Sequence, residues 1–300
     1  MEQIKVNSSS AWIKAFRLKT LSGAAVPVVI AGALAYNEIK ESTEVFQWGI
    51  FLLALLFALL MQIDANLIND YFDFKKGSDR EDRLGPKRAC AQGWITPKAM
   101  KTGIVIVTIV CCLVGLPLAL IADLRLILIG AACIAFAFLY TTHLSYMGLG
   151  DILVLIFFGV VPIGFTFYLL SSGIWTWHTT ALGIACGFAI DTLLIINNYR
   201  DFEQDKLSGK KTLIVKFGPK FGIVLYTFSI LICTLLTMFT ISDIKSFRYA
   251  LPILFFLIRS LHTNRKMAKT QGSELNKLLG ETSSNILLYG ILTTISLLAQ

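Results

Sequence analysis

The feature of this 300-residue chain that most limits its fold is a series of long apolar runs. Because a bilayer core of about 30 Å needs about 20 helical residues to cross, runs of this length predict transmembrane helices. The runs lack an alternation of period two and are uniformly apolar, which argues against the strands of a membrane barrel. Nine spans are expected, at residues 21–37, 47–70, 102–121, 125–142, 150–171, 178–199, 220–241, 248–262 and 284–299.

Composition agrees with this interpretation, since 55% of the residues are hydrophobic, 15% are charged and the mean hydropathy is +0.69. A soluble domain is rarely so apolar. We therefore predict an all-α, polytopic membrane protein, with one transmembrane domain over residues 1–300 whose helices enclose a central cavity open to lipid. A signal peptide cleaved near Ala35 is an alternative for the first run, but the charge pattern favours its retention as a span.

Charge placement predicts the orientation of the chain in the membrane. If alternate loops face the same side, all but four of the 27 Lys and Arg residues lie on one side, and such residues are retained in the cytoplasm. We therefore expect a multi-pass protein of the inner (cytoplasmic) membrane, with its N-terminus in the cytoplasm and its active site facing the cytoplasm. The net charge of +8 fits an anionic leaflet and an anionic substrate, and it requires no nucleic acid. The four exceptions are Lys40, Arg125, Lys245 and Arg248.

Two polar segments follow apolar runs on the predicted cytoplasmic side, at residues 66–82 ("NLINDYFDFKKGSDRED") and 191–212 ("DTLLIINNYRDFEQDKLSGKKT"). Asn69 precedes Asp73 by four residues, as Asn197 precedes Asp201, so each pair shares one face of a helix. The same arrangement thus occurs twice, separated by four spans. This spacing indicates an internal pseudo-repeat.

Carboxylates crowded at a helix end repel one another unless a proton or a cation intervenes. Carboxylate and amide oxygens suit Mg²⁺, which is typically held by one or two carboxylates together with substrate phosphates. Basic residues near each cluster would neutralise the remaining charge of a metal-bridged diphosphate. A solvated helix end is the alternative for either segment alone, and the matched spacing of the two favours the ion site. The expected metal ligands are Asn69, Asp70, Asp73, Asp79, Asn198, Asp201 and Asp205, and the expected diphosphate-binding residues are Lys75, Arg83, Arg88, Arg200 and Lys210.

These segments resemble the two signature motifs of the UbiA superfamily of intramembrane prenyltransferases. The resemblance extends to "RLKTLSGAAVPV" and "LYTTHLSYMGLGDILVLIFFGVVP" and covers about residues 15–220. In detail it is strongest to the branch that uses 1,4-dihydroxy-2-naphthoate. The family pattern Asn-Asp-x-x-Asp-x-x-x-Asp has Gly77 at its last position here, with Asp79 as the nearest acid, whereas Asp201 and Asp205 match the second motif.

The resemblance implies a Mg²⁺-dependent transfer of a polyprenyl group from polyprenyl diphosphate to 1,4-dihydroxy-2-naphthoate. The carboxylate of the acceptor would leave as carbon dioxide, and the product would be a demethylmenaquinone. Asp73 and Asp201 would be catalytic through the metal. Tyr140 either faces the reacting carbon or is an ordinary interfacial tyrosine.

The basic residues before the first span have two interpretations. Arg17 and Lys19 either bind the acceptor carboxylate or the diphosphate, or they anchor the chain at the membrane surface. Asn66 is placed with them at the acceptor.

Two other functions remain open at this point. One is a UbiA-type transferase with another acceptor, such as 4-hydroxybenzoate, homogentisate or haem. The other is a cation-coupled transporter, favoured mainly by the intramembrane acid Asp191. Transporter sites are expected near the bilayer midplane, whereas most acids here gather at helix ends.

Overall fold

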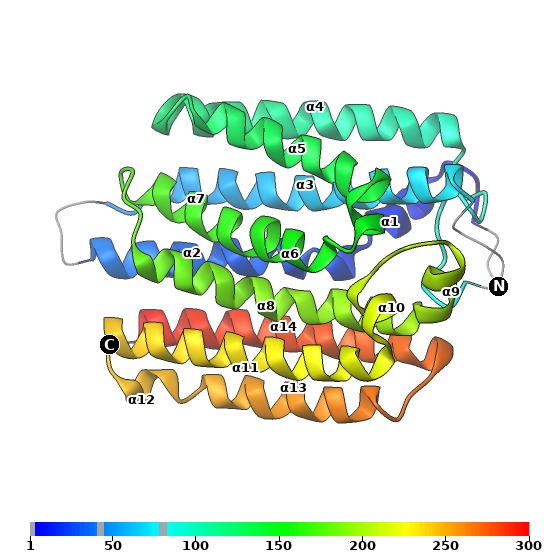
Figure 1. The fold of residues 1–300 in the computed structure, drawn as a ribbon. Helices are drawn as coiled ribbons and strands as arrows, with labels where there is room; N and C mark the ends of the chain where they lie inside the picture. Colours follow the sequence, from blue (N-terminus) through cyan, green and yellow to red (C-terminus); the bar gives the residue numbers. More distant parts are fainter. Residues whose placement is uncertain (1–3, 41–44, 78–82, 300) are drawn as a thin grey trace.

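The computed structural model describes residues 4–40, 45–77 and 83–299. Within these ranges every regular element is helical (Figure 1), which confirms the predicted all-α fold. The long helices are α2 (Ser22–Ile39), α3 (Trp48–Lys75), α4 (Pro97–Ala122), α5 (Leu126–Thr142), α8 (Trp177–Arg200), α11 (Pro219–Ile244), α13 (Ile253–Met267) and α14 (Leu275–Leu298). The shorter elements are α1 (Ser9–Phe16), η1 (Leu18–Thr20), η2 (Leu144–Met147), α6 (Gly150–Leu155), the π-helical η3 (Ile156–Val160), α7 (Val161–Leu170), α9 (Phe202–Leu207), α10 (Leu213–Phe217), α12 (Phe247–Ala250) and η4 (Gly272–Glu274).

Every predicted span coincides with a helix. In the described part of the chain, six helices are long and apolar enough to cross a membrane: α2, α3, α4, the continuous stretch α6–η3–α7, α8 and α11. α5 and α13 are shorter, and α14 is more polar. The polytopic membrane fold is confirmed, and the count of nine spans stays a prediction.

Local sequence explains where the two motif-bearing helices begin and end. α8 begins after Thr176, whose hydroxyl accepts a hydrogen bond from the N–H of Thr179. α3 ends at Lys75, and the following Gly77 has a φ of +68°, which glycine adopts at the lowest cost. Because Gly77 stands at the last acidic position of the family pattern, the departure from that pattern falls where the chain leaves the helix.

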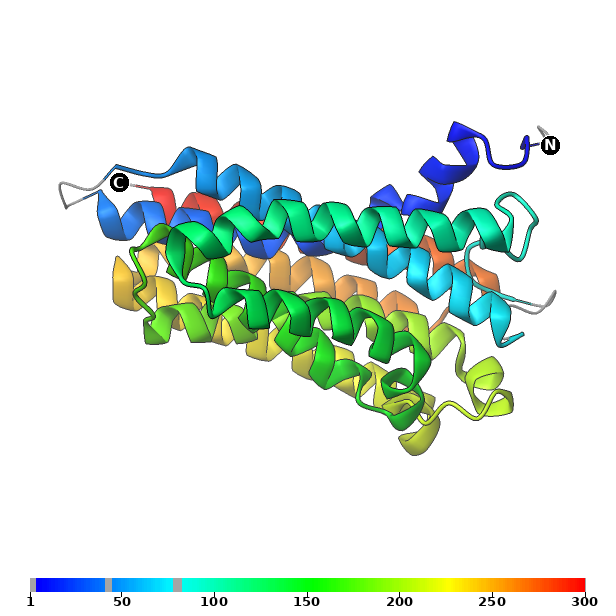
Figure 2. The same ribbon diagram turned by 90° about the horizontal axis from the view of Figure 1, so that it is seen from above.

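Small residues allow the helices to pack closely in the middle of the bundle. α2 packs against α3, α7 and α14, and α8 packs against α11, α14 and η3. A Cβ on Gly159 of η3 would lie 2.3 Å from the carbonyl oxygen of Gly183 in α8, so these two backbones touch directly. Figures 1 and 2 show the long helices side by side along one common direction.

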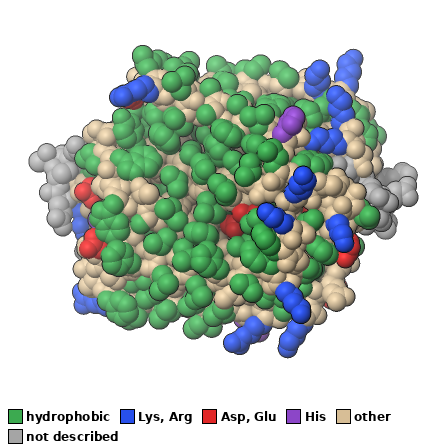
Figure 3. Space-filling model, viewed as in Figure 1, with side chains coloured by type: hydrophobic (Ala, Val, Ile, Leu, Met, Phe, Trp, Pro, Cys, Tyr) green, Lys and Arg blue, Asp and Glu red, His purple; other side chains and the backbone are tan. Residues whose placement is uncertain are grey.

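The surface and the helix directions place both motifs at one end of the bundle. Hydrophobic side chains cover most of the face in Figure 3, and Lys and Arg gather mainly toward the end near the N-terminus. Figure 1 shows the C-terminal ends of α3 and α8 at that end, together with α1, α9 and α10. A hollow of about 400 Å³ lies between α1 and the start of α4, lined in part by Trp12 and Lys98. The central lipid-open cavity stays a prediction.

Candidate active site

The first motif occupies the last turns of α3, where one arginine reaches two of its members. Arg88 donates a hydrogen bond to the amide oxygen of Asn69. Its Nη2 atom also lies 2.9 Å from a carboxylate oxygen of Asp73. Asp73 and Arg88 are both buried. The predicted convergence of Asn69 and Asp73 on one helix face is therefore confirmed.

Asp70 makes different contacts from its neighbours in the motif. One of its carboxylate oxygens accepts from the N–H of Ala89 and the other from the N–H of Cys90, each at 2.9 Å. Nη2 of Arg17 lies 3.9 Å from the same carboxylate. Asp70 thus binds the connection between α3 and α4, which we call the 84–95 loop.

The second motif, at the end of α8, is also organised by an arginine. Nε and Nη2 of Arg200 donate to the two carboxylate oxygens of Asp201 at 2.7 and 2.6 Å. Nη2 also donates to Asn197, and Nη1 donates to Asn276 of α14 at 2.8 Å. Arg200 is buried and bound to protein acceptors at all three nitrogens, although the sequence placed it on the diphosphate. The amide in this network belongs to Asn197, whereas the predicted ligand Asn198 is half-buried.

Asp205 lies beyond α8, on the short helix α9. Lys210 Nζ lies 3.4 Å from its carboxylate. Burial raises the pKa of Asp205 to about 6, and the cation of Lys210 opposes this shift without cancelling it. Asp205 therefore gains or loses its proton near pH 6, and its role as a metal ligand stays a prediction.

Tyr146 of η2 connects the two motifs through a pair of lysines. Lys76, just after α3, has its Nζ 4.2 Å from the centre of the Tyr146 ring, and Lys210 Nζ lies 5.6 Å from the same centre. Lys76 interacts electrostatically with both Asp73 and Lys210. Both motifs therefore lie around one aromatic ring.

A second connection runs through α14. Asn276 donates to the carbonyl oxygen of Leu84 at 2.7 Å while it accepts from Arg200. A Cβ on Gly85 would lie 2.8 Å from Nη2 of Arg200, so glycine allows the loop to approach the second motif closely. The segment after the first motif thus packs on the arginine of the second.

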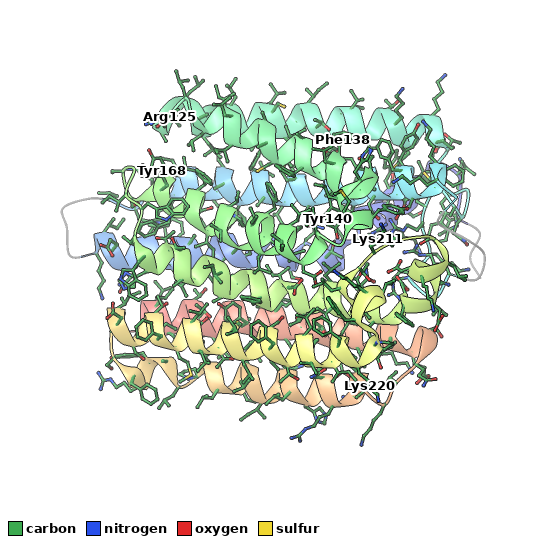
Figure 4. The ribbon with its side chains drawn as sticks, in the orientation of Figure 1. Arg125, Phe138, Tyr140, Tyr168, Lys211 and Lys220 are labelled. Atoms are coloured by element: carbon green, nitrogen blue, oxygen red, sulfur yellow. The ribbon has the colours of Figure 1, made fainter. Side chains whose placement is uncertain are left out.

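Tyr140 lies near the end of α5, where it interacts electrostatically first with the deeper acids Asp151 and Asp191 and then with Asp73 and Asp205 of the two motifs. It is labelled in Figure 4. A Cβ on Gly150, at the start of α6, would lie 3.7 Å from its hydroxyl oxygen. This position is consistent with a tyrosine that faces the site. The role of Tyr140 at the reacting carbon stays a prediction.

The three residues predicted to bind the acceptor have different surroundings. Partial burial and the nearby Arg88 lower the pKa of Arg17 to about 9, so Arg17 remains a cation at neutral pH beside Asp70. Asn66 donates to the carbonyl oxygen of Phe16 and to the Thr20 hydroxyl, both at 3.0 Å. Asn66 thus ties α3 to the N-terminal segment, and Lys19 is exposed.

Three further predicted residues have less definite positions. Lys75 is exposed at the end of α3, where Lys76 instead makes the contacts with Tyr146. Arg83 is half-buried and interacts electrostatically with Arg17. Asp79 lies outside the described residues.

Some residues of the site were not assigned from the sequence. Lys76 was hidden among consecutive basic residues, and Tyr146 follows an unremarkable "HLS". Asn276 lies 192 positions from the loop residue it binds, so no local signal indicated it.

Acidic side chains also lie deeper in the bundle. Asp64 accepts a hydrogen bond from Thr108 of α4 at 2.7 Å. Asp151 of α6 and Asp191 of α8 are buried and interact electrostatically with each other. Of these, the sequence singled out mainly Asp191.

The donor atoms of the two motifs fit a hard divalent cation. Asn69 with Asp73, and Asp201 with Asp205, carry amide and carboxylate oxygens at the same end of the bundle. Arg88 and Arg200 contact those of Asn69, Asp73 and Asp201, so a bound cation would have to replace part of these contacts. Among the described residues, no three His, Cys, Asp or Glu side chains form a preformed metal site. Substrate oxygens and water would therefore have to complete the coordination.

An apolar helical bundle with two acid-and-amide motifs at one basic end defines a membrane protein that handles an anionic substrate. The UbiA prenyltransferase family matches residues 24–286 of the chain. The chain is 33% identical over 297 residues to a 1,4-dihydroxy-2-naphthoate octaprenyltransferase of Haemophilus influenzae, which covers 96% of this chain and 95% of the relative. It is 32% identical to the protein of the same name from Escherichia coli, with 89% of each chain covered.

Solved structures show the same fold. A UbiA homologue from Aeropyrum pernix K1 superimposes with a TM-score of 0.69 at 14% identity, covering 92% of this chain and 96% of the homologue. A UbiA homologue from Archaeoglobus fulgidus bound to DMAPP and Mg²⁺ gives a TM-score of 0.64 at 14% identity, covering 94% and 98%. The chain belongs to the UbiA prenyltransferase family. It is a multi-pass membrane enzyme, an aromatic prenyltransferase, and this membership favours the enzyme over the transporter.

Proposed function

We propose that this protein transfers a polyprenyl group from polyprenyl diphosphate to 1,4-dihydroxy-2-naphthoate, with release of carbon dioxide and diphosphate, to give a demethylmenaquinol, the reduced form of a demethylmenaquinone. The observation that carries the proposal is the meeting of the two motifs around the ring of Tyr146. Lys76 from the first motif segment and Lys210 from the second both lie near this ring. We choose the naphthoate as the acceptor because two relatives named 1,4-dihydroxy-2-naphthoate octaprenyltransferase match about nine-tenths or more of the chain. The metal is proposed to be Mg²⁺, as in the solved homologue with DMAPP.

The residues of the site would act on the charge of the leaving group. The bond that breaks joins the allylic carbon to a diphosphate oxygen, so negative charge grows on the diphosphate. Bound Mg²⁺ would neutralise part of that charge, held by Asn69, Asp73, Asp201 and Asp205. Arg88, Lys76 and Lys210 lie close enough to these acids to bind the other diphosphate oxygens.

The prenyl carbon then forms its new bond to a ring carbon of the acceptor, and the carboxylate leaves as carbon dioxide. Tyr140 is proposed to face this carbon, because an aromatic ring stabilises a developing cation. Arg17, cationic and beside the first motif, is the candidate partner for the acceptor carboxylate. Burial of the motif acids supports a site from which water is excluded.

The proposed location is the cytoplasmic membrane, with the N-terminus and the motif end of the bundle in the cytoplasm. The excess of Lys and Arg at this end supports the orientation. Labelling of a cysteine introduced at exposed Lys75 with a membrane-impermeant reagent, in right-side-out and inverted vesicles, tests it. Reaction only in inverted vesicles is expected.

An acceptor panel tests the function. The purified protein, one allylic diphosphate and Mg²⁺ are incubated separately with 1,4-dihydroxy-2-naphthoate, 4-hydroxybenzoate and homogentisate. Prenylated product and carbon dioxide are expected with the naphthoate alone. Product with 4-hydroxybenzoate instead would leave the family standing and overturn the proposed substrate.

Chelation tests the metal. EDTA should stop turnover, and Mg²⁺ added in excess should restore it. Turnover that persists in EDTA would contradict a metal role for the two motifs.

A further inference from the structure

The 84–95 loop contains a single helical turn whose C-terminal end is capped by backbone hydrogen bonds. The N–H of Trp94 donates to the carbonyl oxygen of Ala89 at 2.9 Å, and the N–H of Gly93 donates to that of Cys90 at 3.0 Å. Gly93 has a φ of +68°. These are the features of a Schellman motif, which ends a helix.

The other end of this turn needs an acceptor from outside. The first N–H groups of a helical turn have no partner within the turn, and an anionic oxygen is the most favourable partner for them. Asp70 supplies one carboxylate oxygen to the N–H of Ala89 and the other to that of Cys90. Asp70 therefore caps this turn from a neighbouring helix.

The residue just before the capped turn is the arginine of the first motif. Arg88 precedes Ala89, and its side chain returns to α3, where it contacts Asn69 and Asp73 on either side of Asp70 in the sequence. The cap at Asp70 and the contacts of Arg88 thus fasten the same short segment to the same turns of α3. Ala89 and Cys90 are buried against α3, which fixes the segment further.

We propose that Asp70 is a positioning residue rather than a metal ligand: it seats the 84–95 loop on α3 and so presents Arg88 to the diphosphate. Both oxygens of Asp70 are directed at backbone N–H groups, which cannot move unless the turn unwinds. Asn69 and Asp73 are left as the metal ligands of the first motif. The part that concerns the diphosphate rests on the function proposed above, whereas the seating of the loop does not.

The first test needs no substrate and uses Cys90 as the reporter. The five other cysteines are replaced by alanine: Cys111, Cys112, Cys133, Cys186 and Cys233. In this background, Asp70→Asn should increase the rate of Cys90 modification by a membrane-impermeant maleimide about tenfold, because the turn loses a capping oxygen and opens more often. Asp123→Asn, at the half-buried carboxylate paired with Arg125, is the matched control and should leave the rate of Cys90 modification unchanged. Protection of Cys90 that is unchanged in Asp70→Asn would overturn the proposal.

The second test separates positioning from metal binding. Asp70→Asn should raise the KM for the diphosphate about tenfold and leave the Mg²⁺ concentration for half-maximal activity unchanged, whereas Asp73→Asn should raise the Mg²⁺ requirement. The double variant Asp70→Asn with Arg88→Ala should be no worse than Arg88→Ala alone, because both act through the same arginine. A raised Mg²⁺ requirement in Asp70→Asn would identify a ligand, and additive losses in the double variant would exclude action through Arg88.

A milder variant covers the case in which Asp70→Asn does not fold. Asp70→Glu keeps both oxygens and the charge but extends the side chain by one carbon, so its cap is displaced rather than removed. It should show an intermediate rate of Cys90 modification. If the acceptor assignment fails while Cys90 becomes reactive in these variants, the seating of the loop stands and the proposed function is wrong.

Discussion

The ends of α3 and α8 carry similar sequences and hold their arginines in different ways. At the end of α8, Arg200 belongs to the motif helix itself and is bound to three partners, two of them on its own chain segment. At the end of α3, Arg88 comes from the following loop, and Asp70 holds that loop in place. The repeat in sequence is therefore not a repeat in construction. The second motif is held by its own helix, and the first depends on the loop that follows it.

The largest expected effect concerns what the two motifs share. Asp73→Asn or Asp201→Asn should each reduce kcat by about 10²- to 10³-fold, because each removes a charged oxygen that neutralises the leaving group through the metal. Turnover under saturating substrates is the measurement, and Asp123→Asn at the opposite end is the control. Arg125, the partner of Asp123, is labelled at that end in Figure 4. A variant of one motif with full activity would show that only the other motif binds metal.

The next effect should separate the two arginines. Arg200→Ala leaves the half-buried Asp201 without its partner, which should reduce the free energy of unfolding by about 3 kcal/mol and lower the Tm. Arg88→Ala should raise the KM for the diphosphate about tenfold. Its Tm should fall less, because Arg88 lies on a loop, whereas Arg200 joins the end of α8 to α14 through Asn276. Thermal unfolding in detergent and steady-state kinetics are the two measurements, and an equal loss of Tm in both variants would remove the distinction.

A smaller effect concerns Asp205, the last acid of the second motif. In the part of the chain that the structure describes, the first motif has no matching acid, because Gly77 stands at that position. With its pKa raised to about 6, Asp205 binds a proton as the pH falls through 6, and a protonated carboxyl cannot hold the metal. Activity should therefore fall below about pH 6, and more Mg²⁺ should move the midpoint to lower pH. Lys210→Met, which removes the opposing cation, should move it to higher pH.

The same shift has the opposite sign for stability. A carboxyl has a pKa near 4 in an unfolded chain, so the folded protein binds this proton more tightly. Between about pH 4 and 6, ionisation of Asp205 should thus make the protein less stable as the pH rises. Asp205→Asn should remove this contribution from a series of Tm values measured against pH.

The smallest effect concerns the aromatic ring between the motifs. Tyr146→Leu should raise the KM for the diphosphate a few-fold, because the ring contacts of Lys76 and Lys210 each contribute about 0.5–1 kcal/mol. Tyr146→Phe keeps the ring and should have the wild-type KM. A loss in Tyr146→Phe equal to that in Tyr146→Leu would assign the effect to the hydroxyl group.

Sequence alone predicted the helices because their signal is local. Long apolar runs indicated the six helices that are long and apolar enough to cross a membrane, and the spacing of Asn69 and Asp73 indicated a shared helix face. The boundaries differ where the chain departs from simple hydropathy. α13 begins at Ile253 rather than 248, after the break at Pro252, and α14 begins nine residues earlier than predicted because its first turns are polar.

The site was less predictable because its details depend on contacts between distant segments. The spacing could not show that Asp70 would point at the N–H groups of Ala89 and Cys90 instead of an ion. Neither could it show that Arg200 would be enclosed by its own neighbours and by Asn276. A sequence shows which charged residues lie at a helix end. The group that each of them contacts depends on how distant segments pack together.

The link made by Asn276 also has a consequence for biosynthesis. This residue starts α14, the final helix, and joins Arg200 to the carbonyl oxygen of Leu84. During translation, α3 and α8 enter the membrane long before Asn276 emerges from the ribosome. In the nascent chain, the loop after α3 and the end of α8 therefore lack the hydrogen bonds of Asn276 until α14 has been inserted.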